Sequence, residues 1–230
     1  MQSIVEVKDL VVHYGSFEAV KGVSFKVARN EIYGIVGGSG SGKSTIAKTL
    51  VGLEKKTSGD IILNAASVQM IFQDAVGSLN PRMTTKETLS EALRHAKHSS
   101  TRSVEELVDI VGLSKAVLNQ YPREMSGGQC QRISVARSLA VNPEVLIADE
   151  PVSALDVSVQ ARILNLFRDL RRELSLSIIL IAHDLAVVKN VCDNVAVMEK
   201  GLFVDEGPAE RVFSSPKSDY TKRLLEGCFS

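Results

Sequence analysis

A glycine-rich segment at residues 37–45 restricts what this chain can fold into more than any other part of the sequence. It reads GGSGSGKST and fits the full pattern G-x-x-x-x-G-K-[ST]. An aliphatic run at residues 31–36 precedes it, and residues 44–52 have the pattern of a helix. A strand, a glycine-rich turn and a helix are the context in which this pattern holds a polyphosphate. We therefore predict an α/β fold in which this turn binds phosphate.

The residue types of this loop suit a polyphosphate with Mg²⁺. Glycines let backbone N–H groups crowd around phosphates, and the helix N-terminus adds its positive dipole end. Lys43 is expected to reach the β- and γ-phosphates, and the Ser44 hydroxyl is expected to ligate Mg²⁺. A flexible linker is the alternative, but linkers do not carry Lys-Ser-Thr at this register. The predicted nucleotide-binding residues of the loop are Gly37, Gly38, Ser39, Gly40, Ser41, Gly42, Lys43, Ser44 and Thr45.

Composition limits the class of protein. The 230 residues are 44% hydrophobic and 23% charged, as is ordinary for a globular domain. Lys and Arg together number 27, as do Asp and Glu, so a net charge of zero gives no support for nucleic acid as a partner. No apolar stretch approaches the ~20 residues that cross a bilayer. If the protein serves a membrane, another subunit must provide the span.

The pattern of the chain changes twice. Residues 4–27 alternate like two or three antiparallel strands, with turns at Gly15 and at residues 29–30. From residue 74 to about 140, strand patterns give way to helical ones at 84–97, 103–111 and 130–140. Strands return at 145–148 and 177–182, with a helix at 157–174 between them. We predict one domain, with residues 1–73 and 141–230 as core and β sub-domain and 74–140 as a helical insert.

Polar side chains follow the predicted strands at the points where the strands end. They are Gln73, Asp149, Glu150 and His183. Ligands of open α/β sheets bind at the carboxyl ends of the strands, so these groups should converge on the phosphates near Lys43. Asp149 is expected to hold Mg²⁺, and Glu150 to orient or deprotonate an attacking water.

A second glycine-rich segment opens the predicted helix at 130–140. It contains Ser126, Gly127, Gly128 and Gln129. A capping serine and free N–H groups suit phosphate binding, but the segment lacks a lysine and a preceding strand. Two copies of the domain, each closing the other's site, would explain why one nucleotide needs both segments.

With these motifs, the chain resembles the ATP-binding subunits of ABC transporters from Tyr14 to about residue 207. Residues 126–129 match the signature of that family, and 153–156, which end in Asp156, match its D-loop. Gln73 and His183 match the Q-loop and switch positions, and Tyr14 matches the aromatic that stacks on adenine. The resemblance implies a P-loop NTPase core with an N-terminal antiparallel β sub-domain and an inserted helical sub-domain. It also implies catalytic roles for Glu150, His183 and Gln73, and Mg²⁺ contacts for Gln73.

Residues 78–84 and 219–225 resemble the importer branch for peptides and nickel. This implies an ATPase on the cytoplasmic face of the membrane, bound to transmembrane permease subunits and to a second ATP-binding subunit. A solute-binding protein outside the cell would be an indirect partner. A soluble ATPase of this type that is not coupled to transport is the alternative. The cargo, and whether the dimer is homo- or heteromeric, stay open, as does the effect of a short segment at 61–69.

The absence of a membrane span in a chain that resembles a transporter subunit implies a docking surface. We expect it at residues 74–97, as a groove for a short helix of the membrane partner. Leu79 and Met83 are its candidate contacts. The alternative is that both are core residues.

Overall fold

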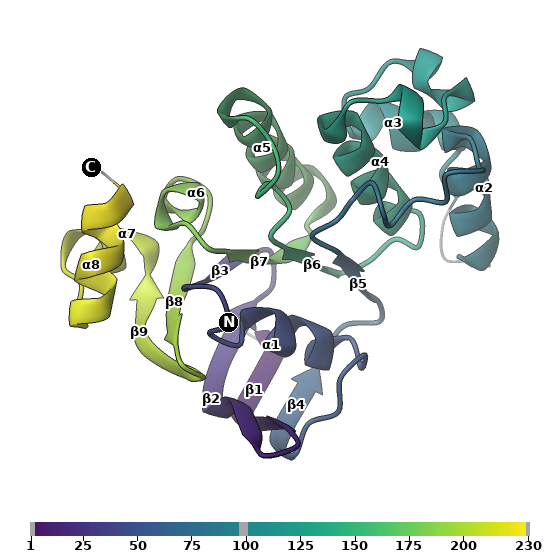
Figure 1. Cartoon of the computed structure of the whole chain (residues 1–230). Helices are drawn as coiled ribbons and strands as arrows, with labels where there is room; N and C mark the ends of the chain where they lie inside the picture. The colour runs from purple at the N-terminus through teal and green to yellow at the C-terminus, as the bar shows by residue number, and fades with distance from the viewer. Residues whose placement is uncertain (1–2, 97–100, 229–230) are drawn as a thin grey trace.

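The computed structural model describes residues 3–96 and 101–228 (Figure 1). The strands are β1 Ser3–Tyr14, β2 Phe17–Ala28, β3 Ile32–Val36, β4 Ser58–Leu63, β5 Val68–Ile71, β6 Val145–Asp149, β7 Ser177–Ala182, β8 Asn194–Glu199 and β9 Leu202–Pro208. The helices are α1 Lys43–Leu50, α2 Thr85–His95, α3 Val104–Ile110, α4 Gly127–Leu139, α5 Val157–Leu174, α6 Leu185–Lys189, α7 Ala209–Ser214 and α8 Asp219–Cys228, with 3₁₀ turns η1 Lys115–Asn119 and η2 Pro122–Glu124.

The larger sheet has the strand order β5-β6-β7-β3-β8-β9. All neighbouring pairs in it are parallel except β8 with β9. Its central strands β3, β6 and β7 are buried at every position. Strands covered on both faces read as continuous aliphatic runs, which is why they could be recognised in the sequence. Because they run parallel, their carboxyl ends meet at one edge of the sheet.

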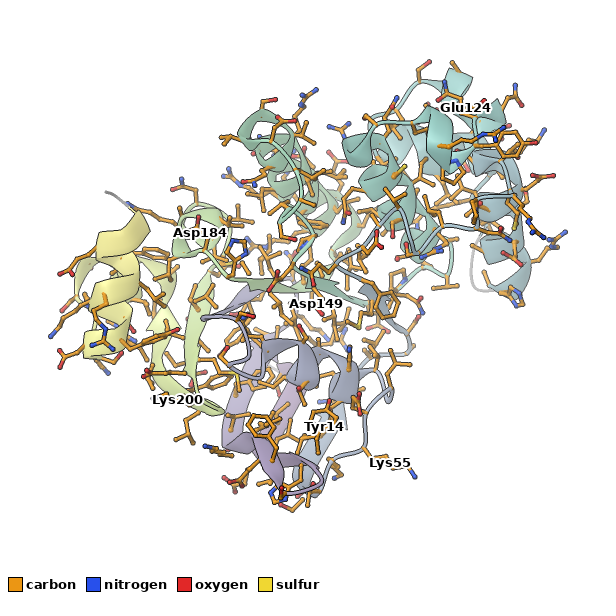
Figure 2. All side chains as sticks on the ribbon, in the orientation of Figure 1. Tyr14, Lys55, Glu124, Asp149, Asp184 and Lys200 are labelled. Atoms are coloured by element: carbon orange, nitrogen blue, oxygen red, sulfur yellow. The ribbon has the colours of Figure 1, made fainter. Side chains whose placement is uncertain are left out.

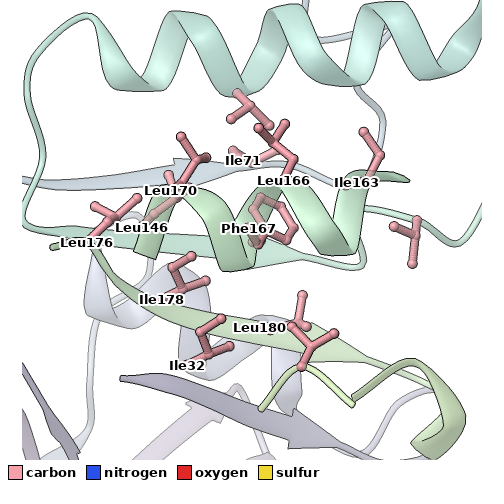
Figure 3. Packing of buried hydrophobic residues seen from close by; sticks show 14 of the residues in the cluster. Ile32, Ile71, Leu146, Ile163, Leu166, Phe167, Leu170, Leu176, Ile178 and Leu180 are labelled. Carbon is pink, nitrogen blue, oxygen red and sulfur yellow. The ribbon is translucent and has the colours of Figure 1, made fainter. Parts of the chain in front are cut away.

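The two faces of this sheet belong to two hydrophobic clusters. Ile32 and Ile178 pack with Phe167 of α5 and with residues of α2, α3 and α4, as Figure 3 shows for part of the cluster. Tyr33 and Ile179, one position further along their strands, pack with β1, β2 and α1 on the other face. Successive side chains of a strand point to opposite faces, so each strand serves both clusters.

A smaller antiparallel sheet, ordered β2-β1-β4, covers the second face (Figure 1). β1 and β2 form the expected hairpin, with Tyr14 opposite Phe17 and a turn at Gly15, whose φ is 61°. The third strand is β4, which pairs with β1 at the other edge. The prediction of antiparallel strands within residues 4–27 is confirmed, with two strands in that range.

Between β5 and β6 the described residues form helices and turns but no strand. In Figure 1, α2, α3 and α4 lie together at the upper right. Capping boxes start all three of these helices: Thr84 accepts from Glu87 N at α2, Ser103 from Glu106 N at α3, and Ser126 from Gln129 N at α4. α2 ends at His95, and Lys97, where the predicted helix ended, is outside the described residues. The division into core and insert at residues 74 and 140 stays a prediction.

Two further features were not predicted. The 3₁₀ turns η1 and η2 and the helix α7 are short, and short segments carry too little periodicity to be recognised.

No helix within residues 3–96 and 101–228 is long and apolar enough to cross a membrane.

Candidate nucleotide-binding site

A pocket of about 560 Å³ opens at the carboxyl edge of the larger sheet. The loop after β3, Gln73 after β5, Glu150 after β6 and His183 after β7 all line it. The full lining is Tyr14, Phe17, Ala19, Gly38, Ser39, Gly40, Gly42, Lys43, Ser44, Thr45, Gln73, Glu150 and His183. The predicted convergence of strand ends around the glycine-rich loop is therefore present.

The loop turns into α1 through a residue that must be glycine. Gly42 is the N-cap of α1 and has φ 111°, in the left-handed region. A Cβ there would lie 2.4 Å from the Ala19 carbonyl oxygen. The first N–H groups of a helix have no partner within the helix, so this turn presents donors to the pocket.

Lys43 is 4% exposed, and its ammonium group lies inside the loop. Nζ donates to the Gly37 carbonyl oxygen at 2.8 Å and to that of Gly38 at 2.9 Å. Burial lowers the pKa of Lys43, while the charges of Glu150 and Asp149 act in the opposite direction. The cation is thus held by carbonyl groups of the loop, beside the pocket that a phosphate would enter.

Ser44 and Asp149 form a hydrogen-bonded pair behind the loop. Ser44 Oγ donates to Asp149 Oδ1 at 2.9 Å, and Asp149 is 5% exposed. In Figure 2, Asp149 lies near the centre of the molecule, at the junction of its parts. Burial raises the pKa of Asp149 and outweighs the bond from Ser44, which lowers it. Hydroxyl and carboxylate oxygens are the donors that Mg²⁺ prefers, so the pair fits that ion.

Glu150 is the centre of the polar cluster. Gln73 Nε2 donates to Glu150 Oε2 at 3.0 Å, and His183 Nδ1 lies 3.9 Å from the same oxygen. Glu150 has φ 45°, so its backbone is left-handed immediately after β6. Such a conformation costs free energy in a residue other than glycine and is often found at functional sites. The geometry allows Glu150 to act on a water while Gln73 and His183 orient it.

Two aromatic side chains form the outer wall of the pocket. Tyr14 and Phe17 pair across the β1–β2 turn and are 43% and 61% exposed. Tyr14 was predicted as an adenine-stacking residue and Phe17 was not. The signal that could have found Phe17 was present: two aromatics flank a two-residue turn, which places them side by side on the hairpin.

The second glycine-rich segment is not part of this pocket. Ser126 is the N-cap of α4: its Oγ accepts from Gln129 N, and its own N–H donates to Gln129 Oε1 at 2.8 Å. A Cβ on Gly128 would lie 2.5 Å from Val159 Cγ1, so the start of α4 packs closely on α5. Asp156 caps α5 by accepting from Val159 N, and Ser158 keeps the pKa of its carboxyl low. The structure does not bring Ser126, Gly127, Gly128, Gln129 or Asp156 to the chain's own loop.

Comparison with known proteins agrees with this geometry. A sequence model of the ABC transporter family matches residues 20–153, more than half of the chain. The oligopeptide transport ATP-binding protein OppF of Lactococcus lactis subsp. lactis (strain IL1403) is 44% identical over 255 residues, covering 98% of this chain and 80% of that protein. OppF of Escherichia coli (strain K12) is 43% identical over 256 residues, covering 96% of this chain and 76% of that protein.

Solved structures show the same fold. The structure of cbiO1 from Clostridium perfringens, described as part of the ABC transporter complex cbiONQ, has a TM-score of 0.82 at 27% identity, covering 94% of this chain and 92% of that one. A dimeric ATP-binding cassette, MJ0796 bound to ADP and Pi, has a TM-score of 0.78 at 26% identity, covering 89% of this chain and 98% of that one. The fold and the site define a P-loop ATPase with an antiparallel β-sheet and a helical insertion. The chain belongs to the ABC transporter family, as an ATP-binding subunit that hydrolyses ATP to drive transport.

Proposed function

We propose that this chain is the ATP-hydrolysing subunit of a membrane importer for oligopeptides. The observation that carries the proposal is the pocket in which the phosphate loop faces Glu150, Gln73 and His183. Identity of 44% over 98% of the chain to an oligopeptide transport ATP-binding protein supports the cargo class. Nickel or metal chelates remain a second cargo class, because the sequence motifs that suggested the peptide branch are similar in both.

In the proposed mechanism, the loop amides and Lys43 bind the ATP phosphates, and Tyr14 stacks on adenine. Ser44 and Asp149, with Gln73, would hold Mg²⁺, and the ion would supply positive charge to stabilise the transferred phosphoryl group. Glu150 takes the proton of the attacking water or orients it, since its carboxylate faces the pocket at the end of β6. His183, 3.9 Å from Glu150, orients the γ-phosphate and the water. These residue roles are part of the proposal.

We further propose that the working unit is a dimer. The start of α4, with Ser126, presents helix N–H groups away from the chain's own pocket. A second ATP-binding subunit, identical or related, would bring its signature segment and Asp156 to this pocket. The dimeric cassette described with ADP and Pi supports this arrangement.

The docking surface for the permease is proposed at residues 74–96, with one correction. Leu79 was expected to be a surface contact. It is instead 3% exposed and belongs to the hydrophobic cluster that contains Ile32 and Phe167. Leu79 follows a turn in which Ser78 N donates to Asp74 O, and this turn directs it inward. Met83 is partly buried and lines a shallow groove of about 400 Å³ with Lys86, Glu87, Ser90 and Arg94. Val76 is 49% exposed on the same segment, and Phe72, which precedes the segment, is 39% exposed.

A hydrogen bond within the chain links the proposed docking surface to α4, so a movement of one would move the other. Arg137 of α4 donates to the Ser78 carbonyl oxygen at 2.6 Å, and burial lowers the pKa of its guanidinium. The segment that follows Gln73 is therefore fixed to the helix that begins with the signature. We propose that the subunit lies on the cytoplasmic face of the membrane, bound to permease subunits, with an extracytoplasmic solute-binding protein as an indirect partner.

Reconstitution tests the proposal. The full chain, its permease and solute-binding partners are placed in proteoliposomes with ATP, and uptake of a labelled oligopeptide is compared with uptake of nickel. The chain carrying Lys43→Ala provides the inactive control. Peptide uptake that depends on ATP and on Lys43 is the expected result. ATP hydrolysis by the purified chain with no transport of either cargo would favour a soluble ATPase, and nickel uptake alone would reassign the cargo.

A further inference from the structure

The C-terminal helix α8 reaches the phosphate loop through one side chain. Gly38 N–H donates to Tyr220 Oη at 2.8 Å, across 182 residues of sequence. Tyr220 was not predicted to belong to the site. A Cβ on Gly38 would lie 3.1 Å from that hydroxyl, so the loop and the tyrosine approach each other closely.

Tyr220 and Lys43 hold the two ends of one peptide group. The N–H of Gly38 and the carbonyl of Gly37 belong to the same planar unit. Tyr220 accepts from its N–H, and Lys43 Nζ donates to its oxygen at 2.8 Å. Because the peptide plane is rigid, the hydroxyl fixes the orientation of the carbonyl that receives the lysine ammonium.

Several contacts around the start of α8 hold Tyr220 in place. The start of α8 is capped by Ser218, whose Oγ accepts from Thr221 N at 3.0 Å. One residue earlier, Lys217 N donates to the buried Asp205 of β9 at 2.7 Å. Tyr220 packs against the hydrophobic cluster that contains Ile32 and Phe167, and the Arg223 guanidinium lies 5.9 Å from the Tyr220 ring centroid. α8 also contacts α6, the helix that follows His183.

We infer that Tyr220 is a positioning residue of the phosphate loop, which orients the 37–38 peptide for Lys43 and so raises the affinity for the ATP phosphates. The inference rests on ATP binding at this loop, which it deepens. A loop already held in its binding conformation loses less conformational freedom when the nucleotide arrives. Loss of the hydroxyl therefore weakens binding without removing any group that touches ATP.

Tyr220→Phe tests this in the full-length chain. It keeps the ring and removes the hydroxyl. The Kd for Mg-ATP should rise about fivefold, the effect that one hydrogen bond commonly has. KM should rise by a similar factor while kcat at saturating ATP stays within about twofold, because the chemical groups are unchanged. The ¹⁵N–¹H resonance of Gly38 should shift, and its amide hydrogen should exchange faster.

Tyr33→Phe is the matched control. It removes another buried tyrosine hydroxyl bond, to Glu206, on a ring that is 2% exposed. Its melting temperature can change, but its Kd for ATP should not. If Tyr220→Phe lowers only the melting temperature and leaves the ATP Kd as in the wild type, the role of Tyr220 is structural and the inference is wrong. A wild-type chain that fails to bind ATP would overturn the proposed function, and this inference with it.

A double-mutant cycle with Gly38→Ala gives an independent measurement. The added Cβ crowds the tyrosine hydroxyl at 3.1 Å, and the Tyr220→Phe background has no hydroxyl for it to crowd. Gly38→Ala should therefore weaken ATP binding more in the wild-type background than in the Tyr220→Phe background. Equal effects in both backgrounds would mean that the two residues do not act on each other, and would contradict the inference.

Discussion

Asp149 and Glu150 are adjacent carboxylates that the backbone places in different environments. Asp149 ends β6, is 5% exposed and accepts from Ser44. Glu150 leaves the strand in a left-handed conformation, and its carboxylate lies on the pocket beside Gln73. One strand end thus supplies a buried group suited to a metal and a pocket-facing group suited to water.

The first prediction concerns the pocket-facing carboxylate. Glu150→Gln should reduce kcat for ATP hydrolysis at least about 100-fold, because the amide keeps the shape but cannot accept the proton of water. The ATP Kd should stay within about twofold of the wild type. Steady-state hydrolysis and equilibrium nucleotide binding measure the two quantities. Glu173→Gln is the control, since Glu173 is exposed on α5. Hydrolysis by Glu150→Gln at the wild-type rate would show that another group is the base.

The second prediction is that the buried charge of Asp149 lowers the stability of the nucleotide-free chain. The pKa of Asp149 is raised in the folded chain, chiefly by burial, so the folded state binds this proton more tightly than the unfolded state. Stability therefore falls as the pH rises from the ordinary aspartate range through the higher folded pKa. Asp149→Asn should raise the melting temperature of the nucleotide-free chain at neutral pH, by about 2–4 °C for each kcal/mol gained.

Melting curves over pH check the sign. The difference between Asp149→Asn and the wild type should disappear below the ordinary aspartate range, where both states of the wild type are protonated. Asp60→Asn is the control, because the Asp60 side chain is 76% exposed. A lower melting temperature for Asp149→Asn at neutral pH would mean that the Ser44 bond outweighs the burial of the charge.

At the level of helices, α3 and α4 begin with the same kind of capping box, but only the start of α4 is proposed to contact nucleotide. Ser103 and Ser126 are exposed N-caps of capping boxes, with Glu106 and Gln129 as the reciprocal partners. Gln129 already uses its oxygen on Ser126 N, so its contribution to a partner's nucleotide would come from its remaining NH₂ donors. Ser126 and Gly127 are exposed, and neither lines the chain's own pocket.

Ser126→Arg should leave ATP binding by the single chain within about twofold and abolish hydrolysis, because a bulky cation obstructs the partner's phosphate at this helix end. Mixing it with Lys43→Ala should restore part of the activity, since one site of the mixed dimer then carries neither lesion. Hydrolysis by the mixture is compared with that of each variant alone.

Ser103→Arg is the matched control, with the same loss of a cap, ~1 kcal/mol, at an equally exposed serine. It should remain active. If mixing restores no hydrolysis, the two lesions act within the same chain and the proposed exchange of signature segments is wrong.

Features of the fold and site that depend on nearby residues could be predicted from the sequence, and features that depend on contacts between distant residues could not. The buried parallel strands and α5, predicted at 157–174 and found at Val157–Leu174, follow from apolar patterns within one segment. The grouping of Gln73, Glu150 and His183 followed because parallel strands end at one edge. The Tyr220–Gly38 bond joins positions 182 residues apart, and no local pattern encodes it. The burial of Leu79 depends on a loop turn without periodicity, so the sequence left it open between surface and core.

A further prediction concerns assembly with the membrane partner. Met83→Glu places a charge in the groove beside Glu87 and should prevent assembly or transport, while ATP binding by the free chain persists within about twofold. Co-purification with the permease and peptide uptake measure this. Leu79→Glu should instead lower the melting temperature strongly, because Leu79 is in the core.

Leu53→Glu is the control for an apolar-to-acidic change, as Leu53 is 59% exposed and lies outside this groove. It should assemble and transport normally. Normal assembly and transport by Met83→Glu would exclude this groove as the docking surface.

The order of the larger sheet has a consequence for how the protein is made. β3, which leads into the phosphate loop, pairs with β7 and β8, and the loop itself is held by α8. A ribosome therefore completes the loop sequence long before it has synthesised any strand that flanks it. Non-local pairing of this kind forms late, after the intervening chain has closed its loops. The nascent chain should thus reach its full affinity for ATP only after β7, β8 and α8 have emerged from the ribosome.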